Sequence, residues 1–366
     1  MTSVRYAIVG AGMMGHEHIR NIAMLDNTSI SVIVEPDSAM RESATQLAQS
    51  LGSDQVCGYS EPTDIDWSRA ADAIVIVSPN HTHCELLCQL LPLETPILIE
   101  KPLCTTAEDL QRVESLMQQR SAPVWVAMEY RYMPPTAKFI ADIASGRIGQ
   151  LQMLSIREHR YPFLEKVSDW NRFSEKTGGT MVEKCCHYFD LMCLITKSEP
   201  LRIYCSGAAD VNHLDECYDG RTPDIIDNAY AIVDFANGMR CALDLCMFSE
   251  GSEPQETITA IGDGGKLEAR IPGPDRFWPD APERNAEVAF MPRITQPPVV
   301  ETIVVDEELL AAGDHHGATY FQHQKFLNCV RNAKPVEVTV EDGARAVAMG
   351  IAAEESIRTG RAVSLL

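Results

Sequence analysis

Residues Val4-Arg5-Tyr6-Ala7-Ile8-Val9-Gly10-Ala11-Gly12-Met13-Met14-Gly15 join a short β-type run to three closely spaced glycines. The segment from His16 to Leu25 then has helical character. The stretch therefore predicts a strand, a tight turn and a helix. Gly10 would allow the turn, Gly12 would let a ligand approach the backbone, and Gly15 would let the helix pack on the strand.

Strands and helices continue to alternate after this unit. Strands are expected at Ser29–Val34, Ala71–Val77 and Pro96–Ile99, and helices at Ser38–Leu51, His83–Leu91 and Thr106–Arg120. This alternation implies a parallel sheet with right-handed crossovers. We therefore predict an α/β protein with a doubly wound Rossmann domain at residues 1–124.

The rhythm changes in the second part of the chain. Short strands separated by turn signals such as Asn237-Gly238 predict a mainly antiparallel sheet. The prolines between Ile271 and Pro298 predict a long surface excursion. Residues 125–366 are expected to form an α/β domain with a large open, mostly antiparallel sheet that binds substrate and forms oligomers. Its last helix is expected to pack back toward the Rossmann domain.

Composition excludes several functions. The 366 residues suffice for two domains, and the formal net charge of −21 argues against a nucleic-acid partner. Apolar runs reach only strand length, and the amino terminus enters a strand without a signal peptide, which predicts a cytoplasmic protein without a membrane partner. The twelve cysteines are scattered, and Cys185-Cys186-His187 lacks the second ligand pair of a zinc site, so no metal is predicted.

The ends of the first four expected strands carry the candidate cofactor site, because dinucleotides bind beyond the carboxyl ends of parallel strands. Glu35 would accept hydrogen bonds from the adenosine ribose and repel a 2′-phosphate, which favours NAD and leaves NADP possible. His83 could approach the nicotinamide or could simply begin a helix. The predicted cofactor-binding residues are Gly10, Gly12, Met13, Met14, Gly15, Glu35, Ser78, Pro79, Asn80, His83, Glu100 and Lys101.

Several motifs together resemble the Gfo/Idh/MocA family of oxidoreductases. They are Gly10 to Gly15, Ser78-Pro79-Asn80 with His83, Glu100-Lys101-Pro102, and Gly178-Gly179 followed by Glu183 and His187. The resemblance covers nearly the whole chain and includes the turns Arg131-Tyr132-Met133-Pro134 and Gly146-Arg147-Ile148-Gly149. It implies a nicotinamide-binding domain joined to an open-sheet domain, and action on sugars, inositols and related polyols.

The resemblance places the family's catalytic roles on Lys101, Glu183 and His187. His187 would act as base for a hydroxyl proton, with Lys101 or Glu183 hydrogen-bonding the oxygen, while hydride passes to nicotinamide. Positions four apart on a helix face the same way. The chain departs from the usual pattern, with Glu183 in place of aspartate and Cys185 in place of glycine. The longer side chain shifts the carboxylate by about 1 Å.

Polar residues are expected to line the substrate cleft. Arg160 and Arg172 would suit a carboxylate or phosphate on a sugar, and Trp170 would supply an aromatic platform. A solvated outer face is the alternative for these charges. Arg131 and Lys184 complete the predicted substrate-binding set, and Lys184 has a structural ion pair as its alternative.

Three functions stay open at this point. The first is an NAD(P)-dependent dehydrogenase that interconverts a secondary alcohol and a ketone on a sugar, sugar acid or cyclitol. The second is a redox-neutral glycoside hydrolase or epimerase with tightly bound NAD, and the third is a non-catalytic dinucleotide-binding regulator. Lys101 and His187 count against the regulator. A homodimer or homotetramer is expected, because an open sheet needs its second face covered.

Overall fold

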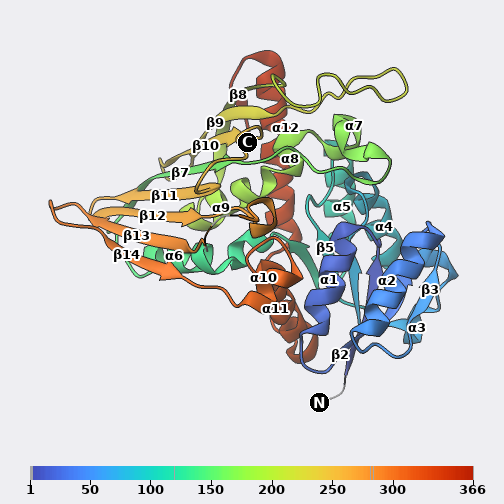
Figure 1. Cartoon of the computed structure of the whole chain (residues 1–366). Coiled ribbons are helices and arrows are strands. Elements are labelled where there is room, and N and C mark those ends of the chain that lie inside the picture. The colour runs from blue at the N-terminus through green and yellow to red at the C-terminus, as the bar shows by residue number, and fades with distance from the viewer. Residues whose placement is uncertain (1–2, 119, 281, 283, 366) are drawn as a thin grey trace. The chain divides into compact units, whose positions relative to one another are not determined.

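The computed structural model describes residues 3–118, 120–280, 282 and 284–365 (Figure 1). Contacts divide the chain into two compact units, Met1–Glu129 with Glu307–Val347, and Tyr130–Asp306 with Ala348–Leu366. The long helix α12 (Val340–Thr359) contributes its first residues to one unit and its last residues to the other. The domain boundary at residues 124 and 125 stays a prediction about which parts fold independently.

The first unit is built on a six-stranded sheet in the order β3-β2-β1-β4-β5-β6. Its strands are β1 (Val4–Val9), β2 (Thr28–Val34), β3 (Cys57–Tyr59), β4 (Ala73–Ile76), β5 (Ile97–Glu100) and β6 (Val124–Ala127). Its α-helices, besides the start of α12, are α1 (Met13–Ala23), α2 (Ser38–Ser50), α3 (Trp67–Ala70), α4 (His83–Leu90), α5 (Ala107–Met117), α10 (Glu307–Ala312) and α11 (Ala318–Asn332). Neighbouring strands all run parallel, and the strand order reverses between β1 and β4. The predicted doubly wound sheet is confirmed, and ligands of such sheets bind at this reversal.

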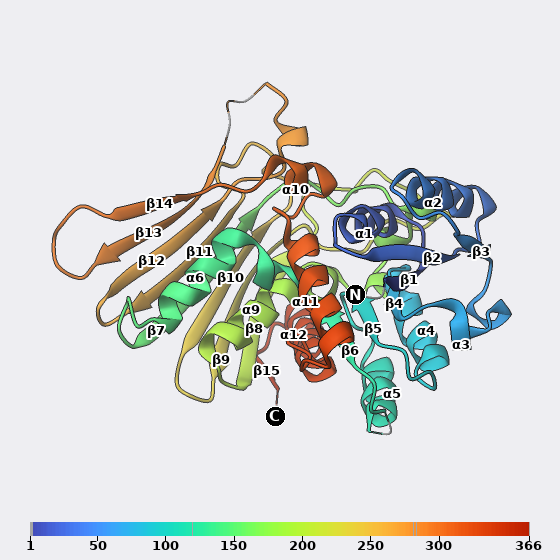
Figure 2. The same cartoon turned by 90° about the horizontal axis from the view of Figure 1, so that it is seen from below.

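The layers of the first unit follow from its apolar strands. Strands β4, β5 and β6 are buried along their whole length, as expected where helices cover both faces of a parallel sheet. Figure 2 shows α1 and α2 on one face and α4 and α5 on the other. The helix expected at Thr106–Arg120 ends earlier, at Met117, and residue 119 lies outside the described residues.

The second unit is built on a nine-stranded sheet in the order β14-β13-β12-β11-β7-β10-β9-β8-β15. Its strands are β7 (Leu151–His159), β8 (Pro200–Ala208), β9 (Asn228–Phe235), β10 (Arg240–Cys246), β11 (Glu256–Gly262), β12 (Gly265–Ile271), β13 (Ala286–Pro292), β14 (Val299–Ile303) and β15 (Val363–Ser364). Its α-helices, besides the end of α12, are α6 (Pro134–Ala144), α7 (Ser174–Thr177), α8 (Thr180–Glu183) and α9 (Cys186–Thr196). Among the described residues of this sheet, β7 and β10 are the one parallel pair, which confirms the predicted mostly antiparallel sheet.

The two faces of this sheet differ. Helices α6 and α9 lie against one face (Figure 2), and the residues of β9 that point to it, Ala229, Ala231 and Val233, are buried. The alternate residues Tyr230 and Ile232 are exposed on the other face. Strand geometry sends successive side chains to opposite faces, so this sheet has one covered face and one open face.

The surface excursion predicted between Ile271 and Pro298 is wrong over strand β13. Ala286–Pro292 pairs with β12 and β14, and Val288 and Ala289 are buried in the unit's core. Prolines flank the strand, and their turn signals led to the prediction of a loop. The short apolar run forms a strand only through its tertiary pairing, which a local sequence pattern does not contain. Residues 281 and 283 of the same stretch lie outside the described residues.

Candidate functional site

The glycine turn between β1 and α1 has the shape of a phosphate cradle. A Cβ atom on Gly10, which has φ +109°, would lie 2.6 Å from the backbone nitrogen of Ser78, and one on Gly15 would lie 2.5 Å from the carbonyl oxygen of Gly10. A Cβ atom on Gly12 would meet nothing within 4 Å, so open space faces this residue. Helix α1 begins at Met13 without a side-chain cap. The turn therefore offers backbone amides and room to a pyrophosphate.

Glu35, at the end of β2, is held beside this turn by two backbone amides. Its Oε2 accepts a hydrogen bond from the Ala11 amide at 2.9 Å, and its Oε1 accepts one from the Asp37 amide at 3.1 Å. The Arg41 guanidinium donates to the Glu35 carbonyl oxygen. These contacts fix a carboxylate next to the glycines, as ribose recognition requires.

The loops that follow β4 and β5 are joined through His83. Its buried ring lies between the carbonyl oxygens of Pro102, 2.7 Å from Nδ1, and Ser78, 2.9 Å from Nε2. Burial lowers the pKa of His83 despite these two acceptors. His83 thus ties the loops together, while the buried Asn80 amide nitrogen has no hydrogen-bond partner among the described residues. Such an orphaned donor fits a polar ligand at this sheet edge.

Lys101 directly follows Glu100, the last residue of β5, and the Glu100 side chain is buried. Glu100 accepts hydrogen bonds from the Lys101 backbone amide at 3.1 Å and from His18 Nε2 at 3.0 Å. Burial by itself raises the pKa of Glu100, but the hydrogen bond from His18 and the charge of Lys101 outweigh it, so the pKa is lowered. Burial and the charge of Glu100 raise the pKa of the nearby Glu129 to about 7. Lys101 therefore leaves the sheet beside buried carboxyl groups.

In the second unit, Glu183 and His187 do not share one continuous helix. Helix α8 ends at Glu183 and α9 begins at Cys186, so the single helix assumed from their spacing is wrong. The linking residues Lys184 and Cys185 keep right-handed backbone angles, and the chain continues as a tightened turn. Glu183 and His187 are both buried.

His187 packs against an aromatic and charged cluster that the motifs did not reveal. Its ring stacks on Tyr130, with centroids 4.0 Å apart and an interplanar angle of 9°. Lys184 Nζ donates to the Tyr130 hydroxyl at 2.7 Å and pairs with Glu158 at 2.9 Å. Glu158 is fully buried and also faces Arg160 at 3.4 Å. The structure thus brings His187, Lys184 and Arg160 together through Tyr130 and Glu158.

The other predicted substrate residues have different partners. Arg131 forms a bidentate buried pair with Asp190 of α9. Arg172 donates from Nε to Glu216 at 2.9 Å. Trp170 lies in the irregular turn before Arg172. The contacts with Asp190 and Glu216 tie loops and helices within the second unit.

Glu354 of α12 is a site residue without a motif. A Cβ atom on Gly179 would lie 2.3 Å from its carboxylate, which accepts a hydrogen bond from the Met181 amide at 2.9 Å. Burial raises the pKa of Glu354 to about 7. Because this carboxyl group holds the turn that leads into Glu183, it fixes the start of α8. The signal in the sequence is a glutamate that directly follows the apolar run Ala346–Ala353 of α12.

The shifted pKa of Glu354 predicts a pH dependence of stability. A rise from 4.5 to about 7 corresponds to roughly 3 kcal/mol at ~1.36 kcal/mol per pKa unit. The folded state binds the extra proton, so this contribution is present below about pH 4.5 and is lost as pH rises through about 7. We expect Glu354→Gln to remove that loss in urea unfolding at several pH values. The exposed neighbour Glu355→Gln serves as control, and equal pH slopes in the two variants would contradict the assignment.

The described part of the chain lacks two other kinds of feature. None of its helices is long and apolar enough to cross a membrane. It holds no group of three or more His, Cys, Asp or Glu side chains placed to bind a metal ion. All twelve cysteines are free thiols.

Models of one protein family match both parts of the chain. Residues 4–128 match the family model for the oxidoreductase family, NAD-binding Rossmann fold, and residues 140–365 match the model for the C-terminal alpha/beta domain of that family. Fold and site together define an NAD-binding oxidoreductase. The chain belongs to the Gfo/Idh/MocA family, as the resemblance predicted. The predicted NAD cofactor and the prediction of an enzyme are confirmed with it.

Two curated proteins and one solved structure illustrate what the chain is similar to. The chain is 23% identical to myo-inositol 2-dehydrogenase of Thermotoga maritima over 373 residues, covering 99% of this chain and 98% of that protein. It is 26% identical to the rhizopine catabolism protein MocA of Rhizobium meliloti over 200 residues, 55% of this chain and 59% of that protein. The crystal structure of a myo-inositol dehydrogenase from Corynebacterium glutamicum matches with a TM-score of 0.78 and 22% identity, covering 100% of this chain and 99% of that one. That structural likeness concerns the fold.

Proposed function

We propose that this protein is an NAD-dependent dehydrogenase that interconverts a secondary alcohol and a ketone on a cyclitol, sugar or sugar acid. The observation that carries the proposal is Lys101, placed at the carboxyl edge of an NAD-binding sheet by the buried Glu100. The names of the inositol dehydrogenases among the relatives support the substrate class. NADP stays possible as a second cofactor.

The chain's own residues bind, orient and move a proton in this proposal. His187 accepts the hydroxyl proton, and its stack on Tyr130 holds the ring plane. Lys101 hydrogen-bonds the reacting oxygen, and Glu183 assists as a buried carboxyl group. The glycine turn with Glu35 binds the dinucleotide, and Ser78, Pro79, Asn80 and His83 shape the adjoining loop. Bound NAD supplies the hydride acceptor.

The test is absorbance of reduced nicotinamide during a screen of cyclitols, sugars and sugar acids with NAD and then NADP. A signal with one substrate class that disappears in Lys101→Ala supports the dehydrogenase. Substrate consumption with retained cofactor and no net absorbance change would indicate a redox-neutral hydrolase or epimerase. Cofactor binding without any substrate conversion would indicate a regulator.

Arg160 is proposed to favour an acidic group on the substrate. Its guanidinium stacks 4.3 Å from the Tyr161 ring centroid and is shared with the buried Glu158. A charge-assisted hydrogen bond contributes about 1.5–3 kcal/mol, so we expect Arg160→Met to lower kcat/KM for sugar acids about tenfold or more relative to neutral cyclitols. Arg157→Met is the control, because Arg157 lies on the same strand and contacts Thr257 on the open face. Unchanged selectivity in Arg160→Met would remove the proposed preference.

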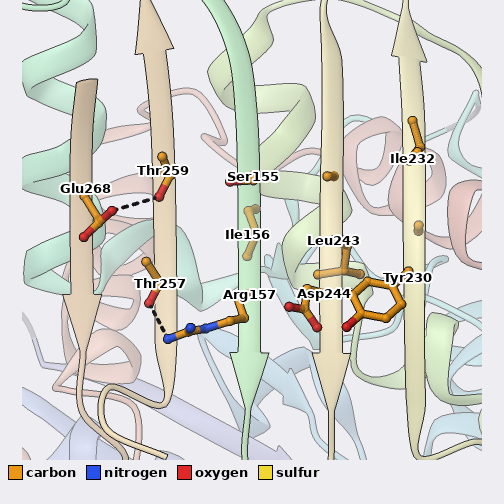
Figure 3. Close-up of a pocket in the computed structure, with 12 residues that line it drawn as sticks. Ser155, Ile156, Arg157, Tyr230, Ile232, Leu243, Asp244, Thr257, Thr259 and Glu268 are labelled. Carbon is orange, nitrogen blue, oxygen red and sulfur yellow. Dashed lines mark hydrogen bonds between the residues drawn. The ribbon is translucent and has the colours of Figure 1, made fainter. Parts of the chain in front are cut away.

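The open face of the nine-stranded sheet is proposed to pack against a second copy of the chain. Figure 3 shows Arg157, Asp244, Tyr230 and Ile232 along a shallow depression of about 540 Å³ on this face. Tyr230 is 67% exposed and Ile232 is 52% exposed. Apolar side chains in such a patch mark an interaction surface, and closed symmetric dimers or tetramers are the commonest way to cover one.

Light scattering at micromolar concentration tests this assembly. We expect the wild-type chain to be a dimer or tetramer and Tyr230→Asp with Ile232→Asp to be monomeric, because two charges cannot be buried unpaired in the contact. Val211→Asp is the control, since Val211 is similarly exposed, at 54%, on the loop between β8 and β9. A monomeric wild-type chain, or a double variant that still assembles, would refute the proposed contact.

A further inference from the structure

Behind the Lys101 turn lies a buried row of three ionisable side chains that no motif required. His18 of α1 is fully buried, and its Nε2 lies 3.0 Å from Glu100 Oε1. Its other ring nitrogen, Nδ1, lies 2.6 Å from Nε2 of His323 on α11, which is also fully buried. We call Glu100, His18 and His323 the histidine chain. All three belong to the first unit.

Hydrogen-bond donors and acceptors along the histidine chain depend on one another. An ionised Glu100 can only accept, so its hydrogen bond with His18 requires the tautomer of His18 that carries the hydrogen on Nε2. If His18 is neutral, its Nδ1 is then bare and accepts from His323 Nε2–H. Burial holds the pKa of His323 well below its usual range, so His323 is neutral. The hydrogen bond from His323 Nε2 to His18 Nδ1 therefore selects the His18 tautomer that donates from Nε2 to Glu100.

The surroundings of the histidine chain are mostly apolar, with few charges. The Tyr6 ring lies edge-on to His323 with centroids 6.1 Å apart. The titratable and charged groups that act electrostatically on its members from neighbouring elements are Glu17 on α1, His83 on α4, Lys101 after β5, and Glu129 after β6. Glu17 is itself held by His315 and Thr319. Because His18 is buried, water does not reach its Nδ1, and the group that can fix its tautomer is His323.

We propose that His323 fixes the tautomer of His18, and that His18 thereby holds Glu100 ionised and oriented on the backbone amide of Lys101. The two histidines are then positioning residues for the lysine. This inference rests on the proposed function for its catalytic consequence. A displacement near 1 Å at a reacting group can lower the rate about a hundredfold. The orientation of Glu100 therefore affects the position of Lys101 and, through it, the reaction rate.

The first test reads the tautomer directly in the protein without cofactor. Two-bond nitrogen-proton NMR of histidine-labelled protein distinguishes Nε2–H from Nδ1–H, and the chain has ten histidines to assign by substitution. We expect His18 to be protonated on Nε2. In His323→Phe the Nδ1–H form should appear, and in His323→Gln, whose amide can still donate, Nε2–H should return. An unchanged His18 tautomer in His323→Phe would overturn the proposal.

The second test reads the position of Lys101 through its chemistry. The charge of Glu100 favours the Lys101 ammonium form, so loss of an oriented carboxylate should speed acylation of this amine. Peptide mass spectrometry gives the acylation rate of Lys101 relative to the exposed Lys334 of the same unit. We expect this ratio to rise in His323→Phe, to return in His323→Gln, and to stay unchanged in Tyr6→Phe. Tyr6→Phe removes a buried hydroxyl from the same pocket but no bond of the histidine chain.

Activity adds the catalytic consequence. In His323→Phe, kcat should fall about tenfold or more with unchanged NAD affinity, and His323→Gln should restore it. If the single variant His323→Phe does not fold, the double variant His18→Gln with His323→Phe replaces it. The glutamine amide can donate to Glu100 without a partner that fixes a tautomer, so we expect the wild-type acylation ratio in this double variant. An altered ratio in that double variant overturns the proposal. Absence of any dehydrogenase activity in the wild type would refute the proposed function, while NMR and acylation would still decide whether the histidine chain positions Lys101.

Discussion

Lys101→Met is expected to lower kcat about a hundred- to ten-thousandfold, the usual range for removing a group that assists proton transfer, and to leave NAD binding intact. Methionine keeps the length of the side chain but removes the ammonium group. The Lys101 backbone amide still donates to Glu100, and Glu100 still meets His18. The turn after β5 should therefore keep its shape while the reacting oxygen loses its hydrogen-bond donor.

Steady-state kinetics with the substrate found in the screen, together with calorimetric titration of NAD, measure this effect. Lys334→Met is the matched control, because Lys334 is an exposed lysine of the same unit. A Lys101→Met enzyme with the kcat of the control would show that the lysine does not act on the reacting oxygen. A parallel loss of NAD affinity would assign Lys101 to cofactor binding.

Lys184→Met is expected to lower the free energy of unfolding by about 3–5 kcal/mol, the cost of leaving a buried charge without its partner. Glu158 is fully buried, and among the described residues the positive charge left beside it without Lys184 at 2.9 Å would be that of Arg160 at 3.4 Å. Burial by itself would raise the pKa of Glu158, but the charges of Lys184 and Arg160 outweigh it and lower the pKa. Burial lowers the pKa of Lys184, although the charges of Glu158 and Glu256 oppose that effect.

Urea unfolding compares this variant with two others. Arg112→Met breaks the exposed pair between Arg112 and Glu85 and should cost less than about 1 kcal/mol. Lys184→Met with Glu158→Gln removes both charges of the pair and should recover part of the loss, because no buried carboxylate is left unpaired and the neutral glutamine can still accept a hydrogen bond from Arg160. Equal losses in Lys184→Met and Arg112→Met would mean that Glu158 is solvated in the native protein.

The structural and catalytic meaning of Lys184 can be separated by the same variants. Lys184 also donates to the Tyr130 hydroxyl, and Tyr130 stacks on His187. The double variant restores part of the stability but not this hydrogen bond. A double variant that is stable and has reduced kcat would therefore connect Lys184 to the orientation of His187. A wild-type kcat would instead support the alternative from the sequence analysis, that Lys184 forms a structural ion pair.

Local constraints explain which features of the protein can be predicted from its sequence. Gly10 is required because its positive φ and its contact with the Ser78 backbone leave no space for a side chain, and that need is visible as a glycine pattern after a strand. The buried run Ile97–Glu100 similarly marks a parallel strand and places Lys101 at its carboxyl end. Both features depend on neighbouring residues along the chain, so a sequence pattern expresses them.

Tertiary structure alone decided which side chains serve these positions from far along the chain. His18 meets His323 across 305 residues, and Glu354 meets the Met181 amide across 173. The same holds for strand β13, whose short apolar run becomes a strand only by pairing with β12 and β14. Such contacts leave no local spacing, because their free energy comes from burial and hydrogen bonding that exist only after the distant segments have packed.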